Sequence, residues 1–173
     1  MKRRGLPLFA LLAFTVIGGG AHAQSTTFNV SGTISPSTCQ WSVASDADRT
    51  VALDPIQASA LPASGATGFK AFSLTLDQCD PGLSTATFSF SGTPDSRDPL
   101  RYKNSGTASG VAVELQSTDG LTIGANGANS TRTTAISAGT TSLPLRAAYW
   151  RVSGASVSAG TVKSVATVSI SYN

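Results

Sequence analysis

Two cysteines, Cys39 and Cys79, are the residues of this 173-residue sequence best suited to covalent chemistry. A thiolate can act as a nucleophile when a neighbouring base activates it, and two thiols can instead be oxidised to a disulfide. Histidine is the usual activating base, and the sequence contains a single one, His22. The use of either cysteine in catalysis therefore depends on the segment that holds His22.

His22 lies in a segment with the organisation of a secretory signal peptide. Basic residues at 2–4 and an apolar run over 6–17 are followed by Ala21-His22-Ala23, which places small residues around a cleavage site. The apolar run is too short for a bilayer, which requires about 20 residues, and no later stretch approaches that length. We expect residues 1–23 to be removed on export.

Removal of this segment leaves little for catalysis or for nucleic-acid binding. The precursor has 12 basic and 9 acidic residues and loses three basic ones, so 9 of each remain and the net charge is zero. A neutral chain without a basic patch does not favour nucleic acid as a partner. Without histidine it lacks the general base of hydrolase triads and the commonest zinc ligand. We expect no enzyme, no metal site and no cofactor.

The two cysteines are therefore expected to form a structural disulfide. They lie 40 positions apart in a chain sent to an oxidising compartment, where an even pair of cysteines is usually bridged. Closing a loop of this length stabilises a fold by about 4 kcal/mol in the loop-closure description. A catalytic thiol is the alternative, and the absence of histidine weighs against it.

Other residues with chemical potential have simpler structural interpretations. Trp41 and Trp150 could stack on a sugar ring, although a tryptophan within or beside a strand is more often part of a core. Asp46 and Asp48 resemble half of a calcium site, but Ser-Asp-Ala-Asp-Arg before a strand is more simply a turn.

The elements that position these residues are short strands. Apolar and polar residues alternate around 72–76, 86–90, 111–116 and 143–149, and no long segment has a helical period. Gly, Asn and Pro mark turns between them. Residues 117–142 are nearly all small and polar, and we expect a hairpin and loop region at the edge of the fold. The pattern predicts one domain, an antiparallel β-sandwich.

Both ends of the exported chain have the pattern of strands without an evident partner. The N-terminal one carries on a single side Thr26, Phe28, Val30, Gly32 and Ile34. The C-terminal one, from Gly160 to Asn173, carries on a single side Val162, Ala166, Val168, Ile170 and Tyr172. We expect its open side to remain uncovered by its own chain.

These features together resemble the pilin subunits of the bacterial chaperone-usher pathway, the type 1-like fimbrial proteins. The carriers of the resemblance follow one another in order: the arm with Gly32 in register, Cys39, FSLTLDQC ending in Cys79, GVAVELQ at 110–116, LPLRAAYW at 143–150, then Gly160 and the penultimate Tyr172. Each is weak alone, so the order and spacing carry the resemblance, which covers nearly all of the exported chain.

The resemblance implies an all-β fold, an incomplete immunoglobulin-like antiparallel β-sandwich that lacks its last strand and carries an N-terminal donor-strand extension. It divides the chain into a signal peptide at 1–23, a donor-strand arm at 24–34 and a pilin domain at 35–173. A periplasmic chaperone would lend a strand to the exposed groove. At an outer-membrane usher, the arm of the next subunit would replace that strand. The function implied is that of a structural subunit of a fimbria at the cell surface.

The resemblance also implies partners. Other pilin subunits would form a head-to-tail polymer, and the assembled fibre would support adhesion, with a host glycan or surface receptor as its candidate contact. The chaperone would hold the terminal carboxylate of Asn173 with basic side chains and pair its strand along 162–172. Tyr172 could be an ordinary core aromatic as well as part of the surface that the chaperone reads.

Two other interpretations stay open at this point. The arm could be the first strand of a complete monomeric sandwich. The chain could also be a single-domain tip adhesin or a monomeric secreted carbohydrate-binding β-sandwich.

The arm gives a first test. Glycine weakens a strand, so Gly32 on the apolar side indicates a close backbone approach that a larger side chain would block. We expect Gly32→Leu to abolish polymerisation and to leave chaperone binding intact, as measured by fibre length and by co-purification with the chaperone. Fibres of normal length would contradict this register.

Overall fold

The computed structural model describes residues 31–33 and 37–173 of a chain that divides into two units, 1–34 and 35–173. In the first unit, residues 31–33 are exposed and belong to no strand. The predicted signal peptide and most of the predicted arm lie outside the described residues. The strands of the described chain all lie in the second unit.

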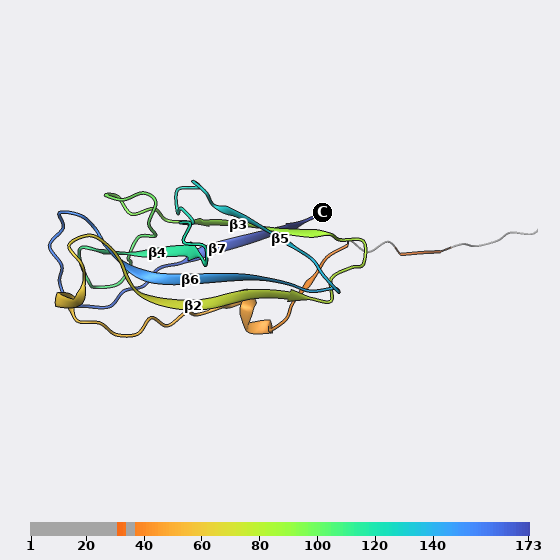
Figure 1. The fold of residues 1–173 in the computed structure, drawn as a ribbon, viewed down its shortest axis with the longest axis horizontal. Coiled ribbons are helices and arrows are strands. Elements are labelled where there is room, and N and C mark those ends of the chain that lie inside the picture. Colours follow the sequence, from red (N-terminus) through yellow and green to blue (C-terminus); the bar gives the residue numbers. More distant parts are fainter. Residues whose placement is uncertain (1–30, 34–36) are drawn as a thin grey trace, which may run out of the picture. The chain divides into compact units, whose positions relative to one another are not determined.

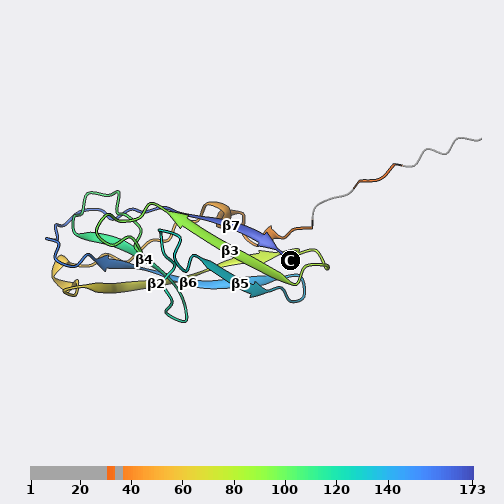
Figure 2. The same cartoon turned by 90° about the horizontal axis from the view of Figure 1, so that it is seen from above.

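The second unit is an all-β, immunoglobulin-like sandwich of two antiparallel sheets (Figures 1 and 2). The four-stranded sheet runs from edge to edge in the order β1 (Gln40–Trp41), β2 (Gly65–Asp77), β6 (Thr141–Arg151) and β4 (Val111–Ser117). The three-stranded sheet has β3 (Thr85–Gly92) between β5 (Thr131–Ala135) and β7 (Ala166–Tyr172). Two short 3-10 helices, η1 (Ala44–Asp48) and η2 (Ala58–Ala60), precede β2.

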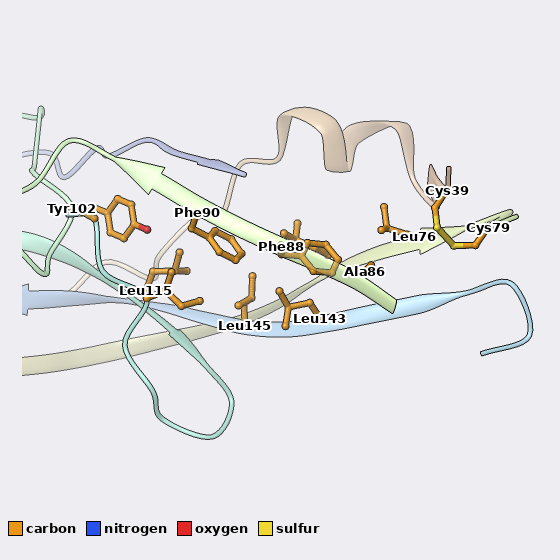
Figure 3. Packing of buried hydrophobic residues seen from close by; sticks show 13 residues of the cluster. Cys39, Leu76, Cys79, Ala86, Phe88, Phe90, Tyr102, Leu115, Leu143 and Leu145 are labelled. Atoms are coloured by element: carbon orange, nitrogen blue, oxygen red, sulfur yellow. A yellow bond between two sulfur atoms is a disulfide. The ribbon is translucent and has the colours of Figure 1, made fainter. Parts of the chain in front are cut away.

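Alternating side chains fill the space between the two sheets. On β3, Ala86, Phe88 and Phe90 point into the core, and the first two are completely buried. Figure 3 shows Phe88 and Phe90 facing leucines of β6. The leucines that the four-stranded sheet contributes are Leu74, Leu76, Leu115, Leu143 and Leu145. Since full burial of one such side chain stabilises by about 1.5 to 3 kcal/mol, this layer is the main source of stability.

The structure confirms the antiparallel sandwich and the strands predicted at 72–76, 86–90, 111–116 and 143–149. The region predicted as hairpin and loop at the edge of the fold, 117–142, contains β5, an edge strand of the three-stranded sheet.

The C-terminal strand begins later than the sequence pattern suggested. The ladder between β3 and β7 starts at Ala166, not at Gly160. The preceding residues are engaged elsewhere, because Thr161 O accepts a hydrogen bond from Ala108 N at 3.0 Å and Lys163 O accepts one from Ser105 N at 2.8 Å. The backbone before Ala166 therefore follows the 105–108 segment instead of β3.

A buried ion pair lies against β4. Arg101 Nε is 2.5 Å from Glu114 Oε2, and the two residues are 8% and 0% exposed. Glu114 Oε1 accepts hydrogen bonds from Gln116 Nε2 and Thr122 Oγ1, both at 2.8 Å. The Arg101 guanidinium also lies over the Trp150 ring, 3.6 Å from its centroid. Such a pair contributes little net stability but fixes the loop that carries Arg101 on the strand.

Tyr102 occupies the end of the core next to this pair. It is 1% exposed, and a Cβ added at Gly92 would lie 2.5 Å from its ring, so the glycine leaves room for the aromatic side chain. The Tyr102 hydroxyl has no hydrogen-bond partner among the described residues. Burial, and then the charge of Glu114, raise the pKa of Tyr102 to about 12.

This raised pKa gives a test of the core. The unfolded chain releases the tyrosine proton near pH 10 whereas the folded chain keeps it, so the contribution of Tyr102 is complete below pH 10 and is lost as the pH rises through about 12. We expect the free energy of unfolding to fall by up to about 2 to 3 kcal/mol from this source. Denaturant titrations between pH 7 and pH 12 measure the fall.

The matching variant is Tyr102→Phe, which keeps the ring and removes the titrating hydroxyl. We expect this variant to lose that part of the alkaline decline and to keep near wild-type stability at pH 7, since the hydroxyl it removes is unpaired. An alkaline decline of wild-type size in Tyr102→Phe would show that another group is responsible.

Candidate strand-acceptor site

β7 is an edge strand with one free side. It pairs with β3, and no other strand of the described chain lies beside it. Val168, Ile170 and Tyr172 are half-buried against the core, whereas the side chains between them are exposed. The free side of an edge strand presents a row of unpaired N–H and C=O groups. β7 therefore offers a backbone template next to an incompletely covered part of the core.

The extended segment at residues 50–56 is a second unpaired stretch of backbone. Val51, Leu53 and Ile56 are half-buried, and Ala52 and Asp54 are exposed, which is close to the period of a strand. No strand is assigned there, and none of the backbone–backbone hydrogen bonds of the described chain involves these residues. The segment has the side-chain pattern of a strand without the ladder.

A hollow of about 390 Å³ connects this segment with the chain that leads into β7. Its lining from the two segments comprises Pro55, Ile56, Ala58 and Leu61 on one side and Val157 to Val162 on the other. Val111 and Tyr149 of the four-stranded sheet line the rest, together with Ala108. Except for the hydroxyls of Ser158, Thr161 and Tyr149, the side chains around it are apolar.

The predicted groove residues of the C-terminal segment lie in two places. Gly160 and Val162 line the hollow, and the three half-buried residues named above follow along β7. Ala166 is exposed at the start of β7. Of the predicted arm, Thr26, Phe28, Val30 and Ile34 lie outside the described residues, and Gly32 is exposed in a stretch without a strand.

Asn173, the last predicted residue, is held by the start of β3. Its O atom accepts hydrogen bonds from Ser84 N, Thr85 N and Ser84 Oγ at 2.6, 2.9 and 2.9 Å. Asn173 N donates to Thr85 O at 3.0 Å. These contacts fix the register at the end of β7. No pattern in the sequence points to Ser84, because a serine between a turn and a strand is common.

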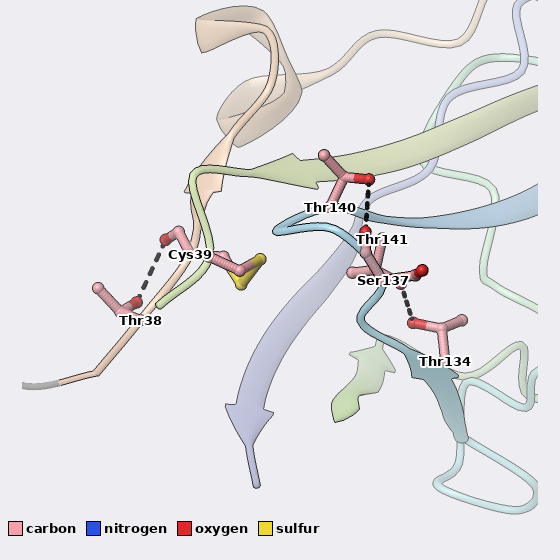
Figure 4. Close-up of a disulfide and its surroundings, with 7 residues drawn as sticks. Thr38, Cys39, Thr134, Ser137, Thr140 and Thr141 are labelled. Carbon is pink, nitrogen blue, oxygen red and sulfur yellow. Dashed lines mark hydrogen bonds between the residues drawn. A yellow bond between two sulfur atoms is a disulfide. The ribbon is translucent and has the colours of Figure 1, made fainter. Parts of the chain in front are cut away.

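The predicted disulfide between Cys39 and Cys79 is present. It joins the residue before β1 to the chain just after β2, two strands that are themselves paired (Figure 4). Cys79 N also donates to Gly139 O at 3.0 Å, which extends the connection to the turn between β5 and β6. Since both sulfurs are bonded to each other, neither is available as a catalytic thiol.

The other candidates from the sequence take structural places. Trp41 packs against the core, and Arg101 covers one face of Trp150. Asp46 is buried in η1 and pairs with Arg49, so the expected turn is a short 3-10 helix. The described residues contain no group of three or more potential metal-ligating side chains. In the same part of the chain, no helix has the length and apolar character needed to cross a bilayer.

Comparison with known proteins relates this geometry to one family. The sequence matches the profile of the fimbrial protein family over residues 28–173. Protein FimG of Escherichia coli K12 is 31% identical over 172 residues, which make up 99% of this chain and 98% of that protein. The P pilus rod subunit PapA has a TM-score of 0.65 at 23% identity, covering 78% of this chain and 99% of its own. A subunit in a chaperone-usher pilus structure has a TM-score of 0.66 at 22% identity, covering 93% and 100%.

The disulfide gives a test at this end of the site. We expect the double variant Cys39→Ala/Cys79→Ala to unfold at lower denaturant, with a loss of about 2 to 5 kcal/mol, because the unfolded chain gains the freedom that the bridge removes. Denaturant titration of the wild type and the variant measures the loss, and Ser42→Ala provides a neighbouring control. Unchanged stability in the double variant would show that the pairing of β1 with β2 alone holds this edge.

Proposed function

The chain belongs to the fimbrial protein family, and from this membership we propose that it polymerises head to tail by donor-strand exchange, its arm completing the next subunit. As a member of the family it is a structural pilin subunit, exported to the cell surface as a component of a fimbria. The observation that carries the proposal is the pair of unpaired backbone stretches, β7 and residues 50–56.

A single added strand beside β7 would also reach the segment at 50–56, because the hollow lined by Pro55 and Ile56 adjoins the chain that leads into β7; the strip between β7 and residues 50–56 is called the groove below. Lying beside β7, it would become the fourth strand of the three-stranded sheet and satisfy the free N–H and C=O groups of that edge. Its alternate side chains would cover Val168, Ile170 and Tyr172, which are only half-buried in the single chain. One element thus supplies the missing hydrogen bonds and the missing apolar cover.

The arm has the composition that this place requires. Phe28, Val30 and Ile34 stand on one side of a period-2 pattern, and their burial would supply roughly 5 to 9 kcal/mol before ordering costs. Gly32, on the same side, allows the backbones to approach closely. We assign the arm to residues 24–34, the pilin domain to 35–173 and the signal peptide to 1–23.

Head-to-tail contacts of this kind lead to a fibre. An arm that enters a groove makes a heterologous contact, which leaves one arm and one groove unused after each addition and so does not close. An unprotected edge is also prone to unwanted pairing. A periplasmic chaperone would cover the groove and so protect the edge from unwanted pairing. An outer-membrane usher would then replace the chaperone with the arm of the next subunit, which extends the fibre. Adhesion to a host glycan or surface receptor would be a property of the assembled fibre, and no enzymatic role is proposed.

Co-expression with candidate periplasmic chaperones tests this proposal. We expect one chaperone to co-purify with the full chain and a synthetic peptide of residues 24–34 to displace it. The same peptide with Gly32→Leu serves as the control and should leave the complex intact, because its side chain would clash in the groove. The proposal is wrong if the chain is a stable monomer that binds neither a chaperone nor the peptide.

A further inference from the structure

We infer that residues 50–56, here called the adjustable wall, are the side of the groove that moves to admit an incoming strand, and that Arg49, Lys70 and Tyr149 set its resting position. The inference rests on the proposed donor-strand exchange. It adds that residues 50–56, and not β7, move when the strand enters. Its basis is a difference in how the two sides of the groove are attached to the domain.

β7 is held by backbone hydrogen bonds along its whole length. Its pairing with β3 runs without interruption from Ala166, opposite Gly92, to Tyr172, opposite Ala86. Beyond the ladder, Ser84 and Thr85 hold Asn173 through three donors to a single oxygen. Any outward movement of β7 would break several of these bonds together, so we treat β7 as the fixed wall.

The adjustable wall has no such ladder, and its polar attachments come from side chains. At its start, Arg49 Nη1 donates to Ser73 O on β2 at 3.0 Å and also pairs with Asp46. Near its other end, Lys70 Nζ lies 3.0 and 3.1 Å from the two carboxylate oxygens of Asp54. The Tyr149 hydroxyl donates to Asp54 O at 3.2 Å.

A bulge in the four-stranded sheet directs two side chains towards Asp54. The register of β2 with β6 shifts between Thr67 and Lys70, which is the position of a bulge. Gly68 lies in this bulge at φ +69°, and a Cβ there would be 3.1 Å from Tyr149 Cδ2. A bulge re-aims the side chains next to it, and here Lys70 and Tyr149 both reach the same residue.

These attachments are weak enough to be released. The Lys70 and Asp54 side chains are 45% and 77% exposed, and an ion pair so open to water contributes little. A neutral hydroxyl-to-carbonyl hydrogen bond is exchanged for water at small cost. Displacement of the wall at Asp54 therefore requires far less than displacement of β7. The backbone of the wall can then pair with the entering strand.

Hydrogen exchange measured by mass spectrometry tests which wall yields. The full exported chain is measured alone and in the presence of a synthetic peptide of residues 24–34. The peptide has no charged side chain. We expect amides of residues 50–56 to exchange rapidly in the chain alone and at least about tenfold more slowly with peptide. The β7 amides that donate to β3 should be protected in both samples. Equal exchange of 50–56 in the two samples, with peptide bound, would overturn the inference.

A double variant tests the attachments themselves. Lys70→Met/Tyr149→Phe frees the wall at Asp54 while keeping the Tyr149 ring against Gly68. We expect the peptide to associate about three- to tenfold faster and to dissociate at an unchanged rate, because the contacts removed exist only before the strand enters. Arg49 is left in place, since its removal would leave the buried Asp46 carboxylate unpaired.

Lys103→Met is the matched control, because Lys103 is an exposed lysine without an ion pair among the described residues. It should bind peptide at the wild-type rate. Wild-type association in the double variant, or equal acceleration in Lys103→Met, would overturn the assignment of Lys70 and Tyr149. Failure of the peptide to bind the wild-type chain would instead overturn donor-strand exchange itself, and this inference with it.

Discussion

The unpaired edge of β7 is the constraint around which the domain is organised. In a two-layer sandwich, one absent strand leaves a backbone edge without partners and, at the same place, a strip of core without cover. Val168, Ile170 and Tyr172 show the second effect, since they face the core and remain half-buried. The domain holds this edge in position by the β3 ladder and by the contacts of Ser84 and Thr85 with Asn173. Such an edge can receive a strand because it is already ordered.

The rest of the core explains how the fold tolerates the gap. Burial is complete where both sheets contribute, as at Phe88 of β3 and Leu145 of β6, and decreases towards β7. The disulfide and the β1–β2 pairing secure the chain at the beginning of the domain, close to the turn that follows β5. The part of the core that stabilises the domain therefore lies between the two sheets, away from the incompletely covered edge at β7. In the proposed exchange, the groove would be filled or emptied without rebuilding the layer that holds the sheets together.

Local pattern determined what could be predicted from the sequence. Alternation predicted the C-terminal half of β2, most of β4 and the middle of β3 and β6, and the cysteine count together with the export signal predicted the disulfide. The features that the sequence pattern did not predict depend on pairing between segments distant in the sequence. Residues 65–71 lack apolar alternation and are a strand only because β6 lies beside them, and β5 is recruited in the same way by β3. The Arg101–Glu114 pair and the contacts of Asp54 join residues far apart in the sequence, so no spacing rule points to them.

The difference between the two walls has a consequence for how an incomplete fold can be completed. A groove with two rigid sides would admit a strand only if both of its backbone edges were in register at once. A groove with two loose sides would present no template. Here the ordered β7 would set the register of an entering strand. The segment at 50–56, whose backbone has no backbone hydrogen-bond partner among the described residues, would then adapt to that strand. In the proposed exchange, removal of the strand after both edges are paired would expose the core of the domain again, so the strand would dissociate slowly and the fibre would be kinetically stable.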